Sequence, residues 1–324
     1  MATPAGPALP IAVVQTAQVL TVLLAAPGVS GVISRVEARL QGRRGPRILQ
    51  PYYDLAKLFA KESLAPAHAS RFFLVAPLLA LTCYLTVPLL IPVLTAFPLP
   101  LGYMADILGG GFILSLAGFS VAVAAAESGG PYAQLGSSRT KTFGAITEPV
   151  VLFVVLSVAL VTTTDLPYAM AATVRSSFTQ VIRPAHLLAA GALFLVILAE
   201  TGRIPVETHT GTNEFGMIEE ARGFEHSGPY FAALRWGSAM KQLILYTILI
   251  NVLLAPWGLA ATAAVGSVAL AVVALVVKAC LVGVGVTLID NSFAKLRLFK
   301  ITEFVSAAFL LAVLAVLTLY LGGG

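Results

Sequence analysis

Carboxylates are concentrated in one short stretch of an otherwise apolar chain. Residues 199–228 read AETGRIPVETHTGTNEFGMIEEARGFEHSG and follow an apolar run that ends at Ala199. Carboxylates a few ångström apart titrate as a coupled set, some protonated and some ionised, and such a set suits proton relay. An ordinary solvated acidic loop fits the same spacing equally well. The stretch holds six of the chain's 15 acidic residues: Glu200, Glu207, Glu214, Glu219, Glu220 and Glu225.

Two more charges lie inside apolar runs. Glu148 occurs in TFGAITEPVVLFVVL and Lys278 occurs in ALVVKACLVGVGV. A charge at the centre of a membrane helix costs about 2.5–3.5 kcal/mol, so such residues usually face a bundle interior and often mark ion pathways. The alternative for both is structural: a buried pair, or a side chain that reaches back to the membrane surface.

The elements that must position these charges are membrane helices. Of the 324 residues, 58% are apolar and only 11% are charged, and the mean hydropathy is +0.91. This composition excludes a soluble globular chain. We predict an all-α integral membrane protein, with residues 1–324 forming a single membrane domain. A spanning helix needs about 20 apolar residues, and about eight runs fit: 8–28, 72–96, 106–126, 144–164, 185–200, 236–255, 260–288 and 302–322.

The positions of lysine and arginine predict the orientation. All 20 of these residues except Arg175, Arg183 and Lys278 fall in or beside the connections after the first, third, fifth and seventh runs. Cytoplasmic loops carry an excess of Lys and Arg. We therefore predict a multi-pass protein of the cell membrane with both termini outside the cytoplasm. The acidic loop, residues 200–235, is then cytoplasmic.

The first cytoplasmic connection is predicted to contain an amphipathic helix. Residues 42–62 read GRRGPRILQPYYDLAKLFAKE, and Pro51 suits a first helical position. Tyr52, Leu55 and Phe59 then fall on one face, with charged residues on another. Such a helix lies at the membrane surface or against a partner. A basic loop that happens to be helical is the alternative.

Composition and motifs also exclude several functions. The only two cysteines, Cys83 and Cys280, lie far apart in apolar runs and form no CxxC motif, so iron–sulfur or zinc ligation by this chain alone is not expected. No Ser/His/Asp or Cys/His arrangement indicates an enzyme active site. The net charge of +5 accompanies no nucleic-acid-binding motif. We expect no nucleic-acid partner, and no cofactor or metal in this chain.

Four segments together resemble one known family. GRRGPRILQPYYDLAKLFAKE, SSRTKTFGAITEP, the acidic stretch and LIDNSFAKLRLFKITEF are similar, in this order, to the family of respiratory complex I membrane proteins that forms part of the quinone site. The chain looks most like the branch found in group 4 membrane-bound hydrogenases and formate hydrogenlyase complexes. Residues 202–207 read GRIPVE where complex I proteins usually read NRAPFD, and the basic segment after the first run is shorter. Both departures favour the hydrogenase branch and count against a quinone site.

The resemblance implies a role for each charged group. It implies a path that links a peripheral redox module to ion-pumping, antiporter-like membrane subunits. Nickel–iron and iron–sulfur centres would then lie in the peripheral large, small and iron–sulfur subunits. The implied members of the path are Glu148, Glu200, Glu207, Glu214, Glu220, Glu225, Lys278 and Asp290. The implied partner contacts are Arg43, Arg44, Arg47, Asp54, Lys57 and Arg203.

Three functions follow from these observations. The first is a non-catalytic membrane anchor that couples hydrogenase-type redox chemistry to proton or sodium movement. The second is a complex I-like subunit that forms part of a quinone site. The third is a self-sufficient secondary transporter, although no internal repeat of the kind common in transporters is found.

Overall fold

The chain is almost entirely helical in a computed structural model that describes residues 9–66, 69–104, 106–176, 178–201, 221–292 and 301–321. This confirms the predicted all-α fold. The short segments are α2 (Gln50–Phe59), η1 (Pro100–Tyr103), α6 (Pro167–Ser176), α7 (Phe178–Ile182), η2 (Ala221–Gly223) and the π-helix η3 (Ile248–Leu254). The long helices are α1 (Ile11–Leu40), α3 (Arg71–Leu90), α4 (Ile107–Glu127), α5 (Pro131–Thr162), α8 (Pro184–Glu200), α9 (Gly228–Thr247), α10 (Val265–Ser292) and α11 (Ile301–Leu321).

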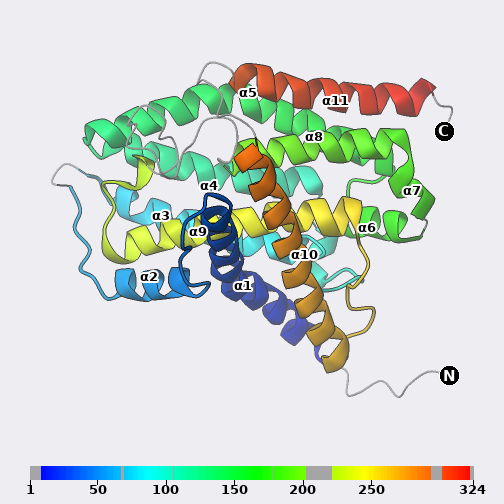
Figure 1. The fold of residues 1–324 in the computed structure, drawn as a ribbon, viewed down its shortest axis with the longest axis horizontal. Helices are drawn as coiled ribbons and strands as arrows, with labels where there is room; N and C mark the ends of the chain where they lie inside the picture. Colours follow the sequence, from blue (N-terminus) through cyan, green and yellow to red (C-terminus); the bar gives the residue numbers. More distant parts are fainter. Residues whose placement is uncertain are drawn as a thin grey trace.

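The long helices pack around α9. Helices α3, α4, α5, α8, α9 and α11 lie roughly along one direction, and α1 and α10 cross them at a steep angle (Figure 1). In α9 with η3, 78% of the most apolar window is buried, against 28% in α10 and 22% in α11. Helices α10 and α11 therefore form the margins of the bundle and turn apolar side chains outwards, as lipid-facing or partner-facing helices do.

Every predicted apolar run falls on a helix, but not every run is a plain span. Six helices in the described residues are long and apolar enough to cross a membrane. The fourth predicted run is the second half of α5, which is bent by 44° between Pro131–Thr142 and Thr147–Thr162. Pro149 explains the bend, because its ring clashes with the carbonyl of Ala145 four residues earlier. The fifth run, α8, has only 17 residues, so the count of eight is not confirmed.

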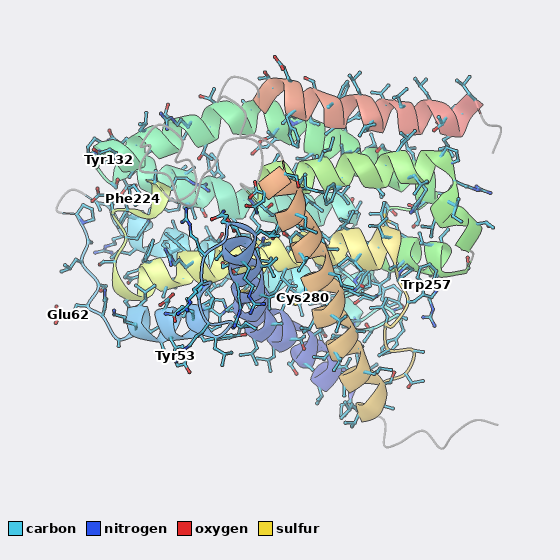
Figure 2. The ribbon with its side chains drawn as sticks, in the orientation of Figure 1. Tyr53, Glu62, Tyr132, Phe224, Trp257 and Cys280 are labelled. Carbon is cyan, nitrogen blue, oxygen red and sulfur yellow. The ribbon has the colours of Figure 1, made fainter. Side chains whose placement is uncertain are left out.

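The amphipathic segment does form a helix, α2, which packs against α1 and α9. Leu55 is buried, whereas Tyr53 lies on the outer surface (Figure 2). The Tyr52 hydroxyl donates to the carbonyl of Leu24 in α1. The loop before α2 approaches α1 so closely that a Cβ at Gly31 would overlap the Ile48 carbonyl. Only glycine permits this approach.

The opposite end of the bundle is joined by buried polar contacts. Gln18 of α1 is fully buried. Its Oε1 accepts from the Leu94 amide at 3.1 Å, and its Nε2 donates to the Ile91 carbonyl at 3.1 Å. These bonds satisfy backbone groups that the chain leaves unpaired where α3 ends. They fix the loop after α3 against α1.

Candidate functional site

A large cavity lies inside the bundle. Its volume is about 1070 Å³, and its wall is formed chiefly by α3, α4, α5, α8 and α9, with α1 and α2 at one end. Helix α4 contributes Gly110, Gly111 and Gly118, where a Cβ would meet no atom within 4 Å. The acidic lining residues are Glu37, Asp54, Asp106, Glu148 and Glu200, and the basic ones are Arg43, Lys141, Arg222, Arg235 and Lys241.

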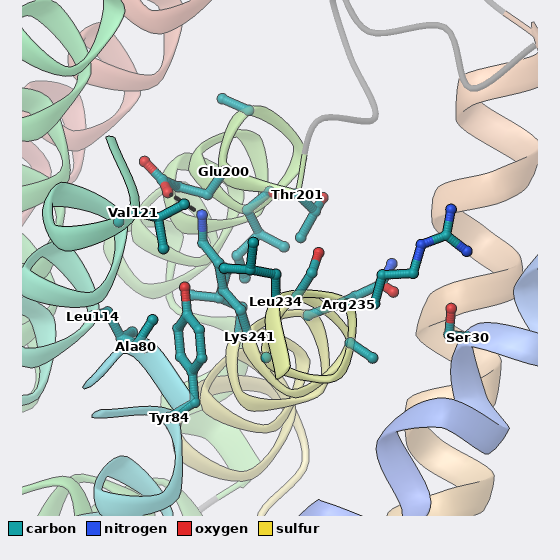
Figure 3. Close-up of a pocket in the computed structure, with 18 of the residues that line it drawn as sticks. Ser30, Ala80, Tyr84, Leu114, Val121, Glu200, Thr201, Leu234, Arg235 and Lys241 are labelled. Atoms are coloured by element: carbon teal, nitrogen blue, oxygen red, sulfur yellow. Dashed lines mark hydrogen bonds and ion pairs between the residues drawn. The ribbon is translucent and has the colours of Figure 1, made fainter. Parts of the chain in front are cut away.

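An ion pair crosses this cavity between two helices. Glu200, the last residue of α8, lies 2.9 Å from Nζ of Lys241 in α9. Figure 3 shows the pair, with Tyr84 rising from α3 beside the stem of Lys241. Gly237 makes room for this tyrosine, because a Cβ there would lie 3.0 Å from the ring. The side chains of the pair are 31% and 15% exposed, so water reaches the carboxylate more freely than the ammonium.

Two of the predicted path residues face the same cavity. Glu148 lines it from α5, one turn beyond the bend, and Glu200 lines it from α8. Thr147 and Glu200 also share a second gap of about 10 Å³ between α5, α8 and α11. A gap of that size is close to the volume needed for a single water. The structure thus brings together the two described carboxylates at the inner ends of the predicted path.

The sequence analysis missed the basic side chains of the cavity. Arg222 is only 8% exposed, and its Nη1 donates to the Gly118 carbonyl of α4 at 3.4 Å. Lys241 is the partner of Glu200. Both had been assigned to membrane orientation alone. The signal that could have found them is distance along the helix, because Lys241 lies 13 residues inside α9, well beyond the reach of a flanking charge.

Glu225 lies apart from the cavity, against the start of α5. A Cβ at Gly130, the residue before α5, would overlap the Glu225 carboxylate. The following residue, His226, stacks on Phe73 with ring centroids 3.9 Å apart. His226 is 5% exposed, and neither ring nitrogen has a hydrogen-bond partner in the described part of the chain. Burial lowers the pKa of His226 from 6.5 to about 4.

Lys278 and Asp290 also lie outside the cavity wall. Lys278 donates to backbone carbonyls of Ala255 and Trp257, just beyond η3. These are the contacts of a helix C-cap, the structural alternative left open by the sequence. Asp290 is buried near the other end of α10. A role for either residue in ion coupling stays a prediction.

The predicted partner contacts divide into two groups. Arg43 and Asp54 line the end of the cavity that α1 and α2 form, and Asp54 accepts from Nε2 of Gln50 at 2.9 Å. Arg44, Arg47 and Lys57 are exposed on the surface around α2. The remaining predicted residues, Arg203, Glu207, Glu214 and Glu220, lie outside the residues that the structure describes.

A helical bundle with spanning helices and an internal charged chamber defines a multi-pass membrane protein. Among the described residues, no group of three or more His, Cys, Asp and Glu side chains could hold a metal ion. Residues 13–321 match the family model described as NADH dehydrogenase, and the chain belongs to this family.

Similar proteins come from membrane complexes. Formate hydrogenlyase subunit 4 of Escherichia coli (strain K12) is 29% identical over 93% of this chain and 96% of its own length. Hydrogenase-4 component C of the same organism is 28% identical over 92% of this chain and 93% of its own length. The resemblance inferred from the four motifs is confirmed by these matches.

A solved structure shares the fold. A chain of the membrane-bound sulfane sulfur reductase, an archaeal respiratory membrane complex, superposes with a TM-score of 0.79 at 19% identity. The match covers 95% of this chain and 99% of the other. The whole chain therefore adopts a fold already seen in a respiratory membrane assembly.

Proposed function

We propose that the chain is the membrane anchor and coupling subunit of a multisubunit, energy-converting complex of the hydrogenase type. In this proposal, peripheral subunits with nickel–iron and iron–sulfur centres dock on its cytoplasmic side. Antiporter-like membrane subunits then move protons or sodium ions. End-to-end similarity to formate hydrogenlyase subunit 4 and hydrogenase-4 component C supports this assignment.

One observation carries the coupling role: Glu148 and Glu200 face a common internal cavity, and Glu200 is paired with Lys241. In an ion pair of this kind, protonation of the carboxylate removes the attraction that holds the ammonium in place. The same event frees a proton-accepting position near Glu148. The cavity therefore offers a route along which a change of charge on one helix is transmitted to another.

The position of Glu200 explains how redox chemistry could act on this pair. Glu200 ends α8 and is followed, one residue later, by the acidic loop that the partner module is expected to contact. A displacement of the loop by a partner would act directly on the end of α8. We propose Glu207, Glu214, Glu220 and Glu225 as further members of the path, with Arg203 among the contacts to the peripheral module.

The partners can be tested by mass spectrometry of the gently solubilised complex. The proposal predicts that hydrogenase-type large and small subunits, iron–sulfur subunits and antiporter-like membrane subunits remain attached. A chain that purifies alone and transports ions in liposomes would instead establish the secondary transporter.

The coupling can be tested with Glu148→Gln in the assembled complex. The glutamine keeps the size of the side chain but cannot release a proton at neutral pH. Ion uptake per electron transferred should fall severalfold while co-purification of the partners is unchanged. Normal uptake would show that Glu148 is a spectator in the cavity wall.

The size of the cavity favours a second candidate, a quinone site. Ligand pockets commonly measure about 300–1,000 Å³ and are mostly apolar with a few polar groups, a description that this cavity fits. Reduction of an added soluble quinone by the intact complex, blocked by Gly118→Leu, would support this candidate. Redox activity that is independent of any quinone would favour the hydrogenase-type assignment.

A further inference from the structure

A lysine ammonium fills a cluster of oxygens at the end of η3. Lys278, in the middle of α10, donates to the Ala255 carbonyl at 2.7 Å, to the Trp257 carbonyl, and to Oδ1 of Asn251 at 3.3 Å. The last carbonyl groups of a helix lack helical partners and carry the negative end of the helix dipole. The three oxygens therefore converge on the position of one positive charge.

The oxygen cluster is held in place by groups other than the lysine. Asn251 is 1% exposed, and its Nδ2 donates to the carbonyls of Pro92 and Val93, each at 3.0 Å. Because carbonyls only accept, these two bonds fix the amide with Oδ1 turned towards Lys278. The neighbouring Leu253 carbonyl is occupied separately, by Nε2 of His186 at 2.8 Å. The cluster is thus built by the loop after α3 and by α8, as well as by η3.

The turn after η3 wraps around the lysine. Gly258 has a φ of +85°, and a Cβ there would lie 3.9 Å from both Cε and Nζ of Lys278. Trp257 is 38% exposed and lies at the edge of the molecule, as Figure 2 shows. The site is therefore enclosed on the side of the turn but lies next to the surface.

The chemistry of the oxygens selects the class of cation. All three are neutral, two from main-chain carbonyls and one from an amide, and none is a carboxylate. Protein sites for Ca²⁺ and Mg²⁺ rely on carboxylates to balance the double charge. Main-chain carbonyls and the C-terminal ends of interrupted membrane helices hold monovalent cations.

We infer that the end of η3 is a monovalent-cation site in which the Lys278 ammonium is a tethered cation. Na⁺ or K⁺ takes the same position when the lysine side chain is shortened. In the wild-type chain the lysine excludes free cations from these oxygens. The inference concerns this site alone and does not depend on the proposed coupling role.

Thermal unfolding of the purified full chain in detergent tests the inference. Wild type, Lys278→Ala and Lys278→Gln are compared in NaCl, KCl and choline chloride at equal ionic strength. Lys278→Ala opens the position, whereas Lys278→Gln keeps it filled with a neutral amide that still donates to the oxygens. We expect the Tm of Lys278→Ala alone to rise with NaCl or KCl over choline chloride. The rise should saturate, and should reach roughly 3 °C at ten times the Kd.

Each other outcome overturns the inference. An equal Tm for Lys278→Ala in all three salts means that no small cation binds. An equal sodium-specific rise in Lys278→Gln places the salt effect elsewhere. If Lys278→Ala is unstable, it is purified in parallel in sodium and in choline. Recovery in sodium or potassium alone supports the site, and failure in every salt contradicts an exchangeable cation.

Discussion

Glu200 and Lys241 show most directly how single residues set up the candidate site. The glutamate was expected from the acidic stretch, because it follows an apolar run and precedes other carboxylates. Its lysine partner lies 41 positions later and was counted only as a determinant of orientation. The structure joins the two at 2.9 Å inside the cavity. Sequence spacing reveals charges that are close along the chain, but not charges that meet across two helices.

A charge-pair cycle distinguishes proton transfer from simple support. Glu200→Gln should leave the complex assembled but lower ion uptake per electron transferred, because the amide cannot accept a proton. If the pair served only to hold α8 against α9, Glu200→Gln combined with Lys241→Gln would restore uptake by removing the unpaired ammonium. We expect no such restoration. Uptake in proteoliposomes is the measurement, and Glu62→Gln, on an exposed residue outside the cavity, is the matched control.

His226 should make stability sensitive to acid. Its pKa is about 4 in the folded protein and 6.5 in the unfolded chain, so between these values the unfolded chain binds the extra proton. Stability is therefore complete above pH 6.5 and falls as the pH drops towards 4, by up to about 3 kcal/mol. His226→Phe keeps the stack on Phe73 and removes the titrating group. It should flatten this part of the pH profile.

Tm measured from pH 7.5 to pH 5 checks this expectation. Carboxylates that titrate in the same range affect both proteins, so only the difference between wild type and His226→Phe reports on the histidine. A constant difference across the series would show that His226 is not buried in its neutral form.

At the scale of elements, hydrophobic runs located every long helix but not their irregularities. All eight predicted runs are helical, because the apolar length of a run is a direct requirement of the bilayer. The bend of α5 depends on how Pro149 is accommodated, and the π geometry of η3 has no signature in the apolar pattern. The position of α2 against α1 and α9 likewise depends on packing. The amphipathic pattern predicted only the helix.

Gly31→Ala tests the contact that positions α2. The added Cβ would overlap the Ile48 carbonyl, and overpacking of this kind costs about 1–3 kcal/mol. We expect a lower Tm and faster proteolysis in the loop before α2. Gly285→Ala is the matched control, since a Cβ there meets no atom within 4 Å. Equal effects of the two substitutions would show that the loop tolerates displacement.

At the scale of the whole molecule, the basic residues form an asymmetric surface. Arg44 and Arg47 are exposed on the predicted cytoplasmic side, while Arg175 and Arg183 are exposed in the connections assigned to the other side. The family and the multi-pass architecture could be predicted from sequence because motifs and apolar length suffice. The cavity could not, because its wall combines short segments of at least five helices.

Charge reversal tests the proposed docking side. Arg44→Glu with Arg47→Glu should release the peripheral subunits, because it replaces attraction to an acidic partner surface with repulsion. Co-purification with the tagged membrane subunit is the measurement. Arg175→Glu with Arg183→Glu changes the net charge by the same amount and should retain the partners. Loss of the partners from both double variants would point to a general effect of charge on assembly.

The π-helical segment has a consequence for how this chain tolerates length changes. Removing one residue from an α-helix rotates everything after it by about 100°. A single deletion within Ile248–Leu254 would therefore swing the succeeding turn around the bundle and carry Trp257 away from α10. Substitutions along α9 alter individual neighbours, whereas a deletion in η3 would misalign the whole far margin of the molecule. This short segment thus sets the register between the two halves of the chain that it connects.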